Sequence, residues 1–151
     1  AKKPTGDTPI VKALRQVVAD KYALLGETHM CHWNVRGSGF FALHTAFEEQ
    51  YNELFTAVDE VAERIRALGA YAPGGIGTLS KMSGFPEIKE NAPAEKMVDH
   101  LAKINRHLVD DLVKARNLAG KAGDQETEDM MIARIQVHEK NIWMLESYLA
   151  A

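Results

Sequence analysis

Apolar side chains recur at steps of three and four residues along most of this chain, the spacing that places them on one face of an α-helix. The first run comprises Val11, Leu14, Val18, Tyr22 and Leu25, and the second comprises Leu43, Phe47, Tyr51, Leu54, Val58, Ala62 and Ile65. Thr8 and Pro9 are typical of a helix start. Because residues 37–39 (Gly-Ser-Gly) interrupt the pattern, we predict a helix over residues 9–36 and a second, antiparallel helix that ends at Gly69.

The pattern lapses between residues 70 and 92, where glycine and proline are frequent, and this segment has room for one short helix near residues 79–82. We expect a third helix from Pro93 to about Gly120 and a fourth from Asp124 to the C-terminus. No segment shows the alternation of a strand. We therefore predict an all-α fold, a four-helix bundle of two hairpins joined by a long crossover that carries a short helix, as in ferritin-like bundles.

Composition is consistent with a single domain. The chain has 151 residues, of which 46% are hydrophobic, and a formal net charge of -3. We assign residues 1–7 to a flexible N-terminal tail and residues 8–151 to the ferritin-like bundle. The single cysteine, Cys31, excludes a disulfide framework, and no apolar run approaches the roughly 20 residues of a membrane span. We expect a cytoplasmic protein without contact to a membrane.

Two histidines flank the first helix break. His32 precedes His44 by twelve positions, so a short antiparallel hairpin sets their imidazoles level. On the second helix, Asp59 follows His44 by fifteen residues and Glu63 follows Asp59 by four. At 100° per residue all these groups share one stripe, but a rise of ~22 Å separates His44 from Asp59. They cannot bind the same ion within one chain.

A second copy of the chain would complete both half-sites. In a two-fold contact, the histidine patch of one subunit faces the carboxylate patch of its partner, which gives two equivalent sites per dimer. The alternative is a site inside the bundle, built from Glu-x-x-His motifs. None of the six histidines has a glutamate three positions before it, so an intra-bundle di-iron site is disfavoured.

These residues resemble the Dps family, mini-ferritins named for DNA protection in starved cells. The resemblance rests on His32-Trp33-Asn34-Val35 and on the spacing of His44, Asp59 and Glu63. It implies a homododecamer of two-fold dimers, a hollow shell that oxidises Fe(II), preferentially with hydrogen peroxide or else with oxygen, and stores Fe(III). His32 and His44 would be the imidazole ligands of this ferroxidase, and Asp59 and Glu63 the partner's carboxylate ligands.

The resemblance also suggests roles for other residues, each with a structural alternative. Glu48 would assist a second iron. Trp33 would donate an electron, or else fill the dimer contact. The acids at the start of the fourth helix would line an entry pore at a three-fold axis, although Asp124 is equally a helix cap; they are Asp124, Glu128 and Asp129. Glu49 and Glu53 would nucleate mineral or form an ordinary polar face.

Two other functions stay open at this point. Nonspecific DNA compaction would use Lys2 and Lys3 on the tail to contact phosphates, with association with the nucleoid as a consequence. Against it, a charge of -3 per chain gives 12 × -3 = -36 for a dodecamer. The same histidines and carboxylates could also hold zinc structurally.

Overall fold

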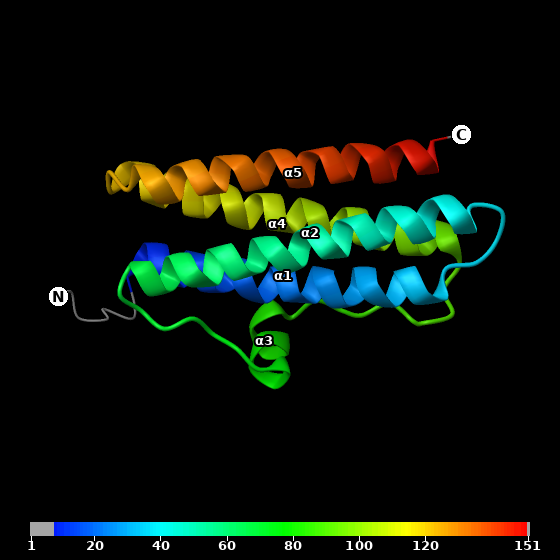
Figure 1. Ribbon diagram of the computed structural model, residues 1–151, viewed down its shortest axis with the longest axis horizontal. Helices are drawn as coiled ribbons and strands as arrows, with labels where there is room; N and C mark the ends of the chain where they lie inside the picture. Colours follow the sequence, from blue (N-terminus) through cyan, green and yellow to red (C-terminus); the bar gives the residue numbers. More distant parts are fainter. Residues whose placement is uncertain (1–7, 151) are drawn as a thin grey trace.

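The computed structural model describes residues 8–150, and this part of the chain forms five α-helices and no strand. They are α1 (Pro9–Asn34), α2 (Phe40–Ala67), α3 (Ile76–Ser83), α4 (Ala94–Lys121) and α5 (Gln125–Leu149). Figure 1 shows the four long helices side by side, with α3 outside them next to α1. The predicted all-α fold with a long crossover and a short helix is confirmed. The predicted tail, with Lys2 and Lys3, lies outside the described residues.

The ends of the first hairpin follow from local chemistry. Thr8 Oγ1 accepts a hydrogen bond from the backbone N–H of Val11 at 3.2 Å, as an N-cap does. Helix α1 ends at Asn34, two residues earlier than predicted, because Val35 is extended (φ -60°, ψ 142°) and turns its side chain into the core. Gly37 then adopts φ +107°, a conformation that favours glycine, and reverses the chain.

The crossover helix is longer than the four residues predicted. Helix α3 spans Ile76–Ser83, and Gly84 ends it in the left-handed conformation with φ +64°. Leu79 is its buried residue, packed in the same cluster as Leu14 and Val18 of α1. This packing holds the crossover against the first hairpin.

Two clusters of buried hydrophobic side chains fill the bundle, one toward each end of its long axis. Phe47 and Leu54 of α2 and Leu101 of α4 belong to the second cluster. Burying each such side chain contributes about 2 kcal/mol, so packing, more than helix propensity, stabilises the fold. Cys31 lies in this cluster, where burial and the nearby Glu27 charge raise the pKa of its thiol to about 12.

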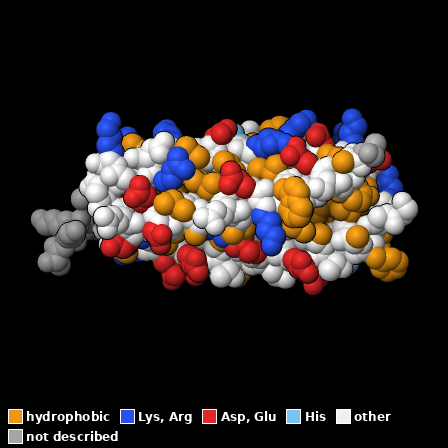
Figure 2. Space-filling model, turned by 90° about the horizontal axis from the view of Figure 1, so that it is seen from above, with side chains coloured by type: hydrophobic (Ala, Val, Ile, Leu, Met, Phe, Trp, Pro, Cys, Tyr) orange, Lys and Arg blue, Asp and Glu red, His pale blue; other side chains and the backbone are white. Residues whose placement is uncertain are grey.

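Several large hydrophobic side chains stay on the surface. Phe41 is 83% exposed, and Trp33 and Trp143 also face outward. Figure 2 shows hydrophobic side chains gathered toward one end of a face and acidic side chains along its edge. Exposed apolar patches are typical of contact surfaces. No helix within residues 8–150 is long and apolar enough to cross a membrane.

Candidate metal centre

The first hairpin sets two imidazoles face to face. Nδ1 of His32, in the last turn of α1, lies 2.7 Å from the backbone carbonyl oxygen of His44. Nδ1 of His44, in the first turns of α2, lies 2.7 Å from the carbonyl oxygen of His32. The rings stack with their centroids 3.8 Å apart. The structure therefore brings these two predicted ligands together, and the reciprocal hydrogen bonds fix both rings.

The same hydrogen bonds assign the protons. A carbonyl oxygen can only accept, so each Nδ1 carries a proton and donates it. In the neutral imidazole this leaves Nε2 of both rings with a lone pair available to a cation. Histidines that bind metals commonly donate their other ring N–H to a carbonyl or carboxylate oxygen. His32 is only 6% exposed and His44 is half-buried, so the pair is rigid but reachable.

Glu48, near the start of α2, lies beside His32. Its Oε1 lies 3.7 Å from Nε2 of His32, longer than a hydrogen bond, and its side chain is exposed. A cation between the two atoms would be bound by both. Of the five predicted metal ligands, the structure thus places His44 against His32 and Glu48 beside His32.

The other two predicted ligands lie further along α2. Asp59 and Glu63 are both exposed, and fifteen residues of helix separate Asp59 from His44 by about 22 Å. Asp59 lines a surface groove of about 820 Å³ between α1, α2 and the crossover, beside Tyr22 and Phe55. Within the described residues of one chain, these carboxylates do not meet the histidines.

Trp33 lies next to the histidine pair through aromatic contacts. Its ring packs on His29 at 4.0 Å between centroids, and His29 packs on Tyr51 at 4.4 Å. Tyr51 meets His32 edge-on at 5.2 Å. Trp33 is 62% exposed, so its ring is accessible at the surface of the chain.

The acids at the start of α5 have different surroundings. Asp124 accepts hydrogen bonds from Thr127 N–H at 3.1 Å and from Arg64 Nη2 at 3.0 Å, so it caps the helix. Burial alone raises the pKa of Asp124, but these bonds and the Arg64 charge lower it overall. Asp129 is exposed and Glu128 is half-buried. Only Asp124 has a structural role that the contacts explain.

The centre of the bundle holds a polar network that the sequence analysis missed. His138 is fully buried; its Nδ1 donates to Asn105 Oδ1 at 2.8 Å and its Nε2 accepts from Lys21 Nζ at 2.9 Å. Arg134, also buried, forms a bidentate ion pair with Glu53. The Glu53 carboxylate is therefore already paired and not free to nucleate mineral. The sequence did contain a clue to this buried network, because Lys21 follows Val18 by three residues and so falls on the apolar stripe of its helix.

Comparisons with known proteins agree with this architecture. Residues 11–151 match the family model described as a ferritin-like domain. General stress protein 20U of Bacillus subtilis is 36% identical over 143 residues, covering 93% of this chain and 97% of the relative. DNA protection during starvation protein 2 of Bacillus anthracis is 34% identical over 140 residues, covering 93% and 96%.

Solved structures give the same result. The crystal structure of Dps from Staphylococcus aureus has a TM-score of 0.91 and 38% identity, and covers 97% of this chain and 98% of its own. The chain belongs to the Dps family of ferritin-like proteins. Dps from Vibrio cholerae O1, described as a member of a broad superfamily of ferritin-like diiron-carboxylate proteins, has a TM-score of 0.89 at 30% identity, covering 93% and 89%. The resemblance inferred from the histidine and carboxylate spacing is thus confirmed for the Dps family.

Proposed function

We propose that this Dps-family chain is a ferroxidase and iron-storage subunit, with sites shared between two subunits. His32 and His44 of one subunit and Asp59 and Glu63 of its partner bind Fe(II), and Glu48 assists a second iron. The assembly is a homododecamer of two-fold dimers in the cytoplasm, formed by residues 8–151, and it stores Fe(III) in its cavity.

One observation supports the proposal above all: the two imidazoles are oriented to bind a cation, but the chain places too few further ligands beside them to complete a metal site. Both Nδ1 atoms are hydrogen-bonded, neither Nε2 atom has a hydrogen-bond partner among residues 8–150, and the exposed carboxylate of Glu48 lies 3.7 Å from Nε2 of His32. A pair of imidazoles with a single carboxylate leaves positions that further oxygen ligands can fill. Asp59 and Glu63 are exposed on the same helix, where a second subunit can reach them.

The groove beside Asp59 supports completion by a second copy. Phe55 and Tyr22 expose apolar rings along it, and burying them gives a reason for two subunits to associate. A two-fold operation brings both half-sites together twice. The exposed hydrophobic side chains elsewhere suit the further contacts of a dodecamer.

The ligand set also suits the oxidation of Fe(II) to Fe(III). Imidazoles bind Fe(II) well, and carboxylates stabilise the harder Fe(III) product. Two Fe(II) ions supply the two electrons that reduce one hydrogen peroxide, with two protons, to two water molecules. No hydroxyl radical is released, so DNA is protected without being bound. Asp124, Glu128 and Asp129 would draw Fe(II) toward a three-fold pore, since a ring of carboxylates focuses cations.

Fe(II) oxidation tests the ligand roles directly. The protein is loaded with Fe(II) without oxygen, peroxide is added, and ferric absorbance is followed. We expect His32→Ala/His44→Ala to lower the initial rate by about 100-fold or more, because the loss of supporting groups alone costs 10–100-fold. His100→Ala, a histidine on α4 that hydrogen-bonds Glu27, is the matched control. Equal rates in wild type and the double variant would exclude the assignment.

Mixing two inactive variants tests the sharing of sites. A heterodimer of His32→Ala/His44→Ala with Asp59→Ala/Glu63→Ala has one intact site and one site without ligands. If the chains are unfolded together and refolded as an equal mixture, half of the dimers are mixed, and we expect about a quarter of the wild-type activity. A mixture as inactive as its parents, despite mixed assembly, would place all ligands in one subunit.

DNA compaction is the second candidate, favoured by the names of relatives such as DNA protection during starvation protein 2. It would use Lys2 and Lys3 and a nucleoid location. A gel-shift titration at low and moderate salt, with the intact chain and with residues 1–7 removed, separates the two roles. Retardation that needs the tail and weakens with salt would support DNA contact. No retardation at low salt would exclude it.

A further inference from the structure

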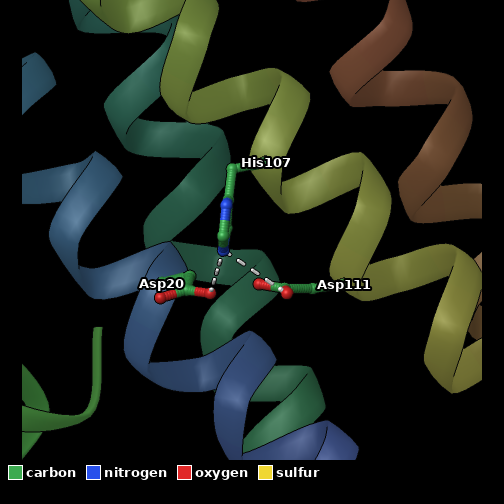
Figure 3. A group of neighbouring side chains, drawn as sticks. All are labelled: Asp20, His107 and Asp111. Atoms are coloured by element: carbon green, nitrogen blue, oxygen red, sulfur yellow. Dashed lines mark ion pairs between the residues drawn. The ribbon is translucent and has the colours of Figure 1, made fainter. Parts of the chain in front are cut away.

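A second group of potential ligands joins α1 to α4, away from the histidine pair. Figure 3 shows Asp20 from α1 pointing at His107 and Asp111 from α4. Nε2 of His107 lies 3.4 Å from Asp20 Oδ2 and 3.6 Å from Asp111 Oδ1. One ligand atom from each residue falls within 4.8 Å of the other two.

Asp20 is buried in a way that leaves one oxygen without a partner. The residue is 0% exposed, and its Oδ1 accepts a hydrogen bond from Gln16 Nε2 at 3.1 Å. Gln16 Nε2 also donates to the carbonyl oxygen of Met82 at 3.0 Å, which ties Asp20 to the end of α3. Oδ2 of Asp20 accepts no hydrogen bond from residues 8–150 and is turned toward His107. A fully buried carboxylate oxygen without a hydrogen-bond partner is costly, so a cation bound at this point would stabilise it.

The spacing of the three residues suits a metal better than direct hydrogen bonds. Separations of 3.4 Å and 3.6 Å exceed the usual 2.7–3.2 Å of N–H···O bonds. Ligands bound to a tetrahedral ion at about 2.0–2.1 Å stand about 3.4 Å from one another. Two carboxylates and one imidazole make a set that suits a divalent transition ion, and the imidazole disfavours Ca²⁺ and Mg²⁺.

Neighbouring side chains orient the His107 ring and leave it accessible to a cation from solvent. The His107 ring packs edge-on against Phe85 of the crossover, with centroids 4.6 Å apart. Its side chain is 49% exposed, so a cation and a water ligand can reach Nε2 from solvent.

We propose that Asp20, His107 and Asp111 form a binding site for a divalent transition-metal ion of the Zn²⁺ type, with a fourth position open to water. The site goes beyond the proposed ferroxidase, because it uses none of its residues. The ion holds α1 and α4 together beside the crossover, which contacts Gln16 of α1 through Met82 and His107 of α4 through Phe85.

Cobalt titration tests the site by a signal independent of iron oxidation. In the His32→Ala/His44→Ala background, Co²⁺ is expected to bind at about one ion per chain and to give the intense visible absorption of a tetrahedral ion. Adding His107→Gln should remove this absorption and weaken binding by at least about 100-fold. Asp111→Asn should do the same, and circular dichroism checks that each variant remains helical.

His100→Gln in the same background is the matched control. This histidine also lies on α4 and meets a buried carboxylate, Glu27, but through one direct hydrogen bond of 2.8 Å. It should bind Co²⁺ as the background does. Absence of tetrahedral absorption in the background, or its persistence in both His107→Gln and Asp111→Asn, would overturn the proposal and leave His107 as a counter-ion.

Discussion

The centre of the bundle and the open end of the first hairpin both contain histidine, but the histidines are in opposite states. In the centre, both ring nitrogens of His138 have partners, Asn105 and Lys21. At the hairpin end, His32 and His44 each hydrogen-bond through one ring nitrogen, and the other nitrogen has no hydrogen-bond partner among the described residues. A metal ion needs an imidazole nitrogen with an available lone pair, so of these two regions the hairpin end is the one suited to bind a metal.

The two regions also differ in the charged side chains that they contain. Four-helix bundles that bind two irons internally present carboxylates to the centre. Here Lys21 and Arg134 occupy the centre, and the carboxylate that reaches them, Glu53, is held in the ion pair with Arg134. An incoming cation would meet the positive charge of Arg134, whose partner carboxylate Glu53 is already paired. The comparison supports the proposal that iron binds at the surface of this chain, where another subunit can complete the site.

The largest expected effect comes from breaking the subunit contact near the hairpin's carboxylates. Phe55 is 63% exposed and lines the groove beside Asp59. We expect Phe55→Glu to lower the ferroxidation rate by about 100-fold or more, because a charge placed in an apolar contact separates the two half-sites. Size-exclusion chromatography should show a smaller assembly with unchanged helicity. Phe55→Leu should retain the assembly, and a wild-type rate in a monomeric Phe55→Glu protein would refute the shared site.

The next effect concerns stability alone. His138→Leu removes the partner of both Lys21 and Asn105, and we expect the free energy of unfolding to fall by about 3 kcal/mol, since each stranded buried group costs 1–3 kcal/mol. Urea unfolding measures the loss, and the double variant Lys21→Met/His138→Leu should recover part of it. The ferroxidation rate of the folded protein should not change. A lost rate with retained stability would mean that the centre takes part in the chemistry.

Acid should destabilise the centre progressively. Burial, and next the charges of Lys21 and Arg134, lower the pKa of His138 well below its usual value, while Glu53 is the nearby counter-charge of Arg134. Below about pH 6.5 the unfolded chain therefore binds a proton at His138 that the folded chain does not, and stability falls by up to about 1.4 kcal/mol per pH unit. Urea unfolding at pH 7.5, 6 and 5 should show this contribution in wild type and not in His138→Gln. Parallel profiles would contradict a neutral His138.

The smallest effect is expected at Trp33. Because Trp33 holds no metal, Trp33→Phe should change the rate of Fe(II) oxidation by no more than about twofold. With one Fe(II) per site, peroxide needs a second electron, and a tryptophan-centred radical should be detectable by electron paramagnetic resonance in wild type only. An identical radical signal in the variant would assign Trp33 to packing.

Much of this protein was predictable from local pattern. The three- and four-residue periodicity predicts the long helices, because each must bury one stripe, and the glycine-rich breaks predict the turns between them. The spacing of His32, His44, Asp59 and Glu63 predicts two half-sites on one stripe, since helix rise and rotation are fixed. Boundaries were less certain: Val35 ends α1 early because its side chain is needed in the core.

Only the tertiary structure decided which polar groups meet. Asp20 and Lys21 are adjacent in sequence, yet a rotation of 100° sends one toward His107 and the other toward His138. Those partners lie 87 and 117 residues away, and no local pattern encodes such a distance. Helix packing sets both contacts. The sequence by itself determined where the helices and their stripes lie, whereas packing determined which imidazole nitrogens are occupied and which remain free.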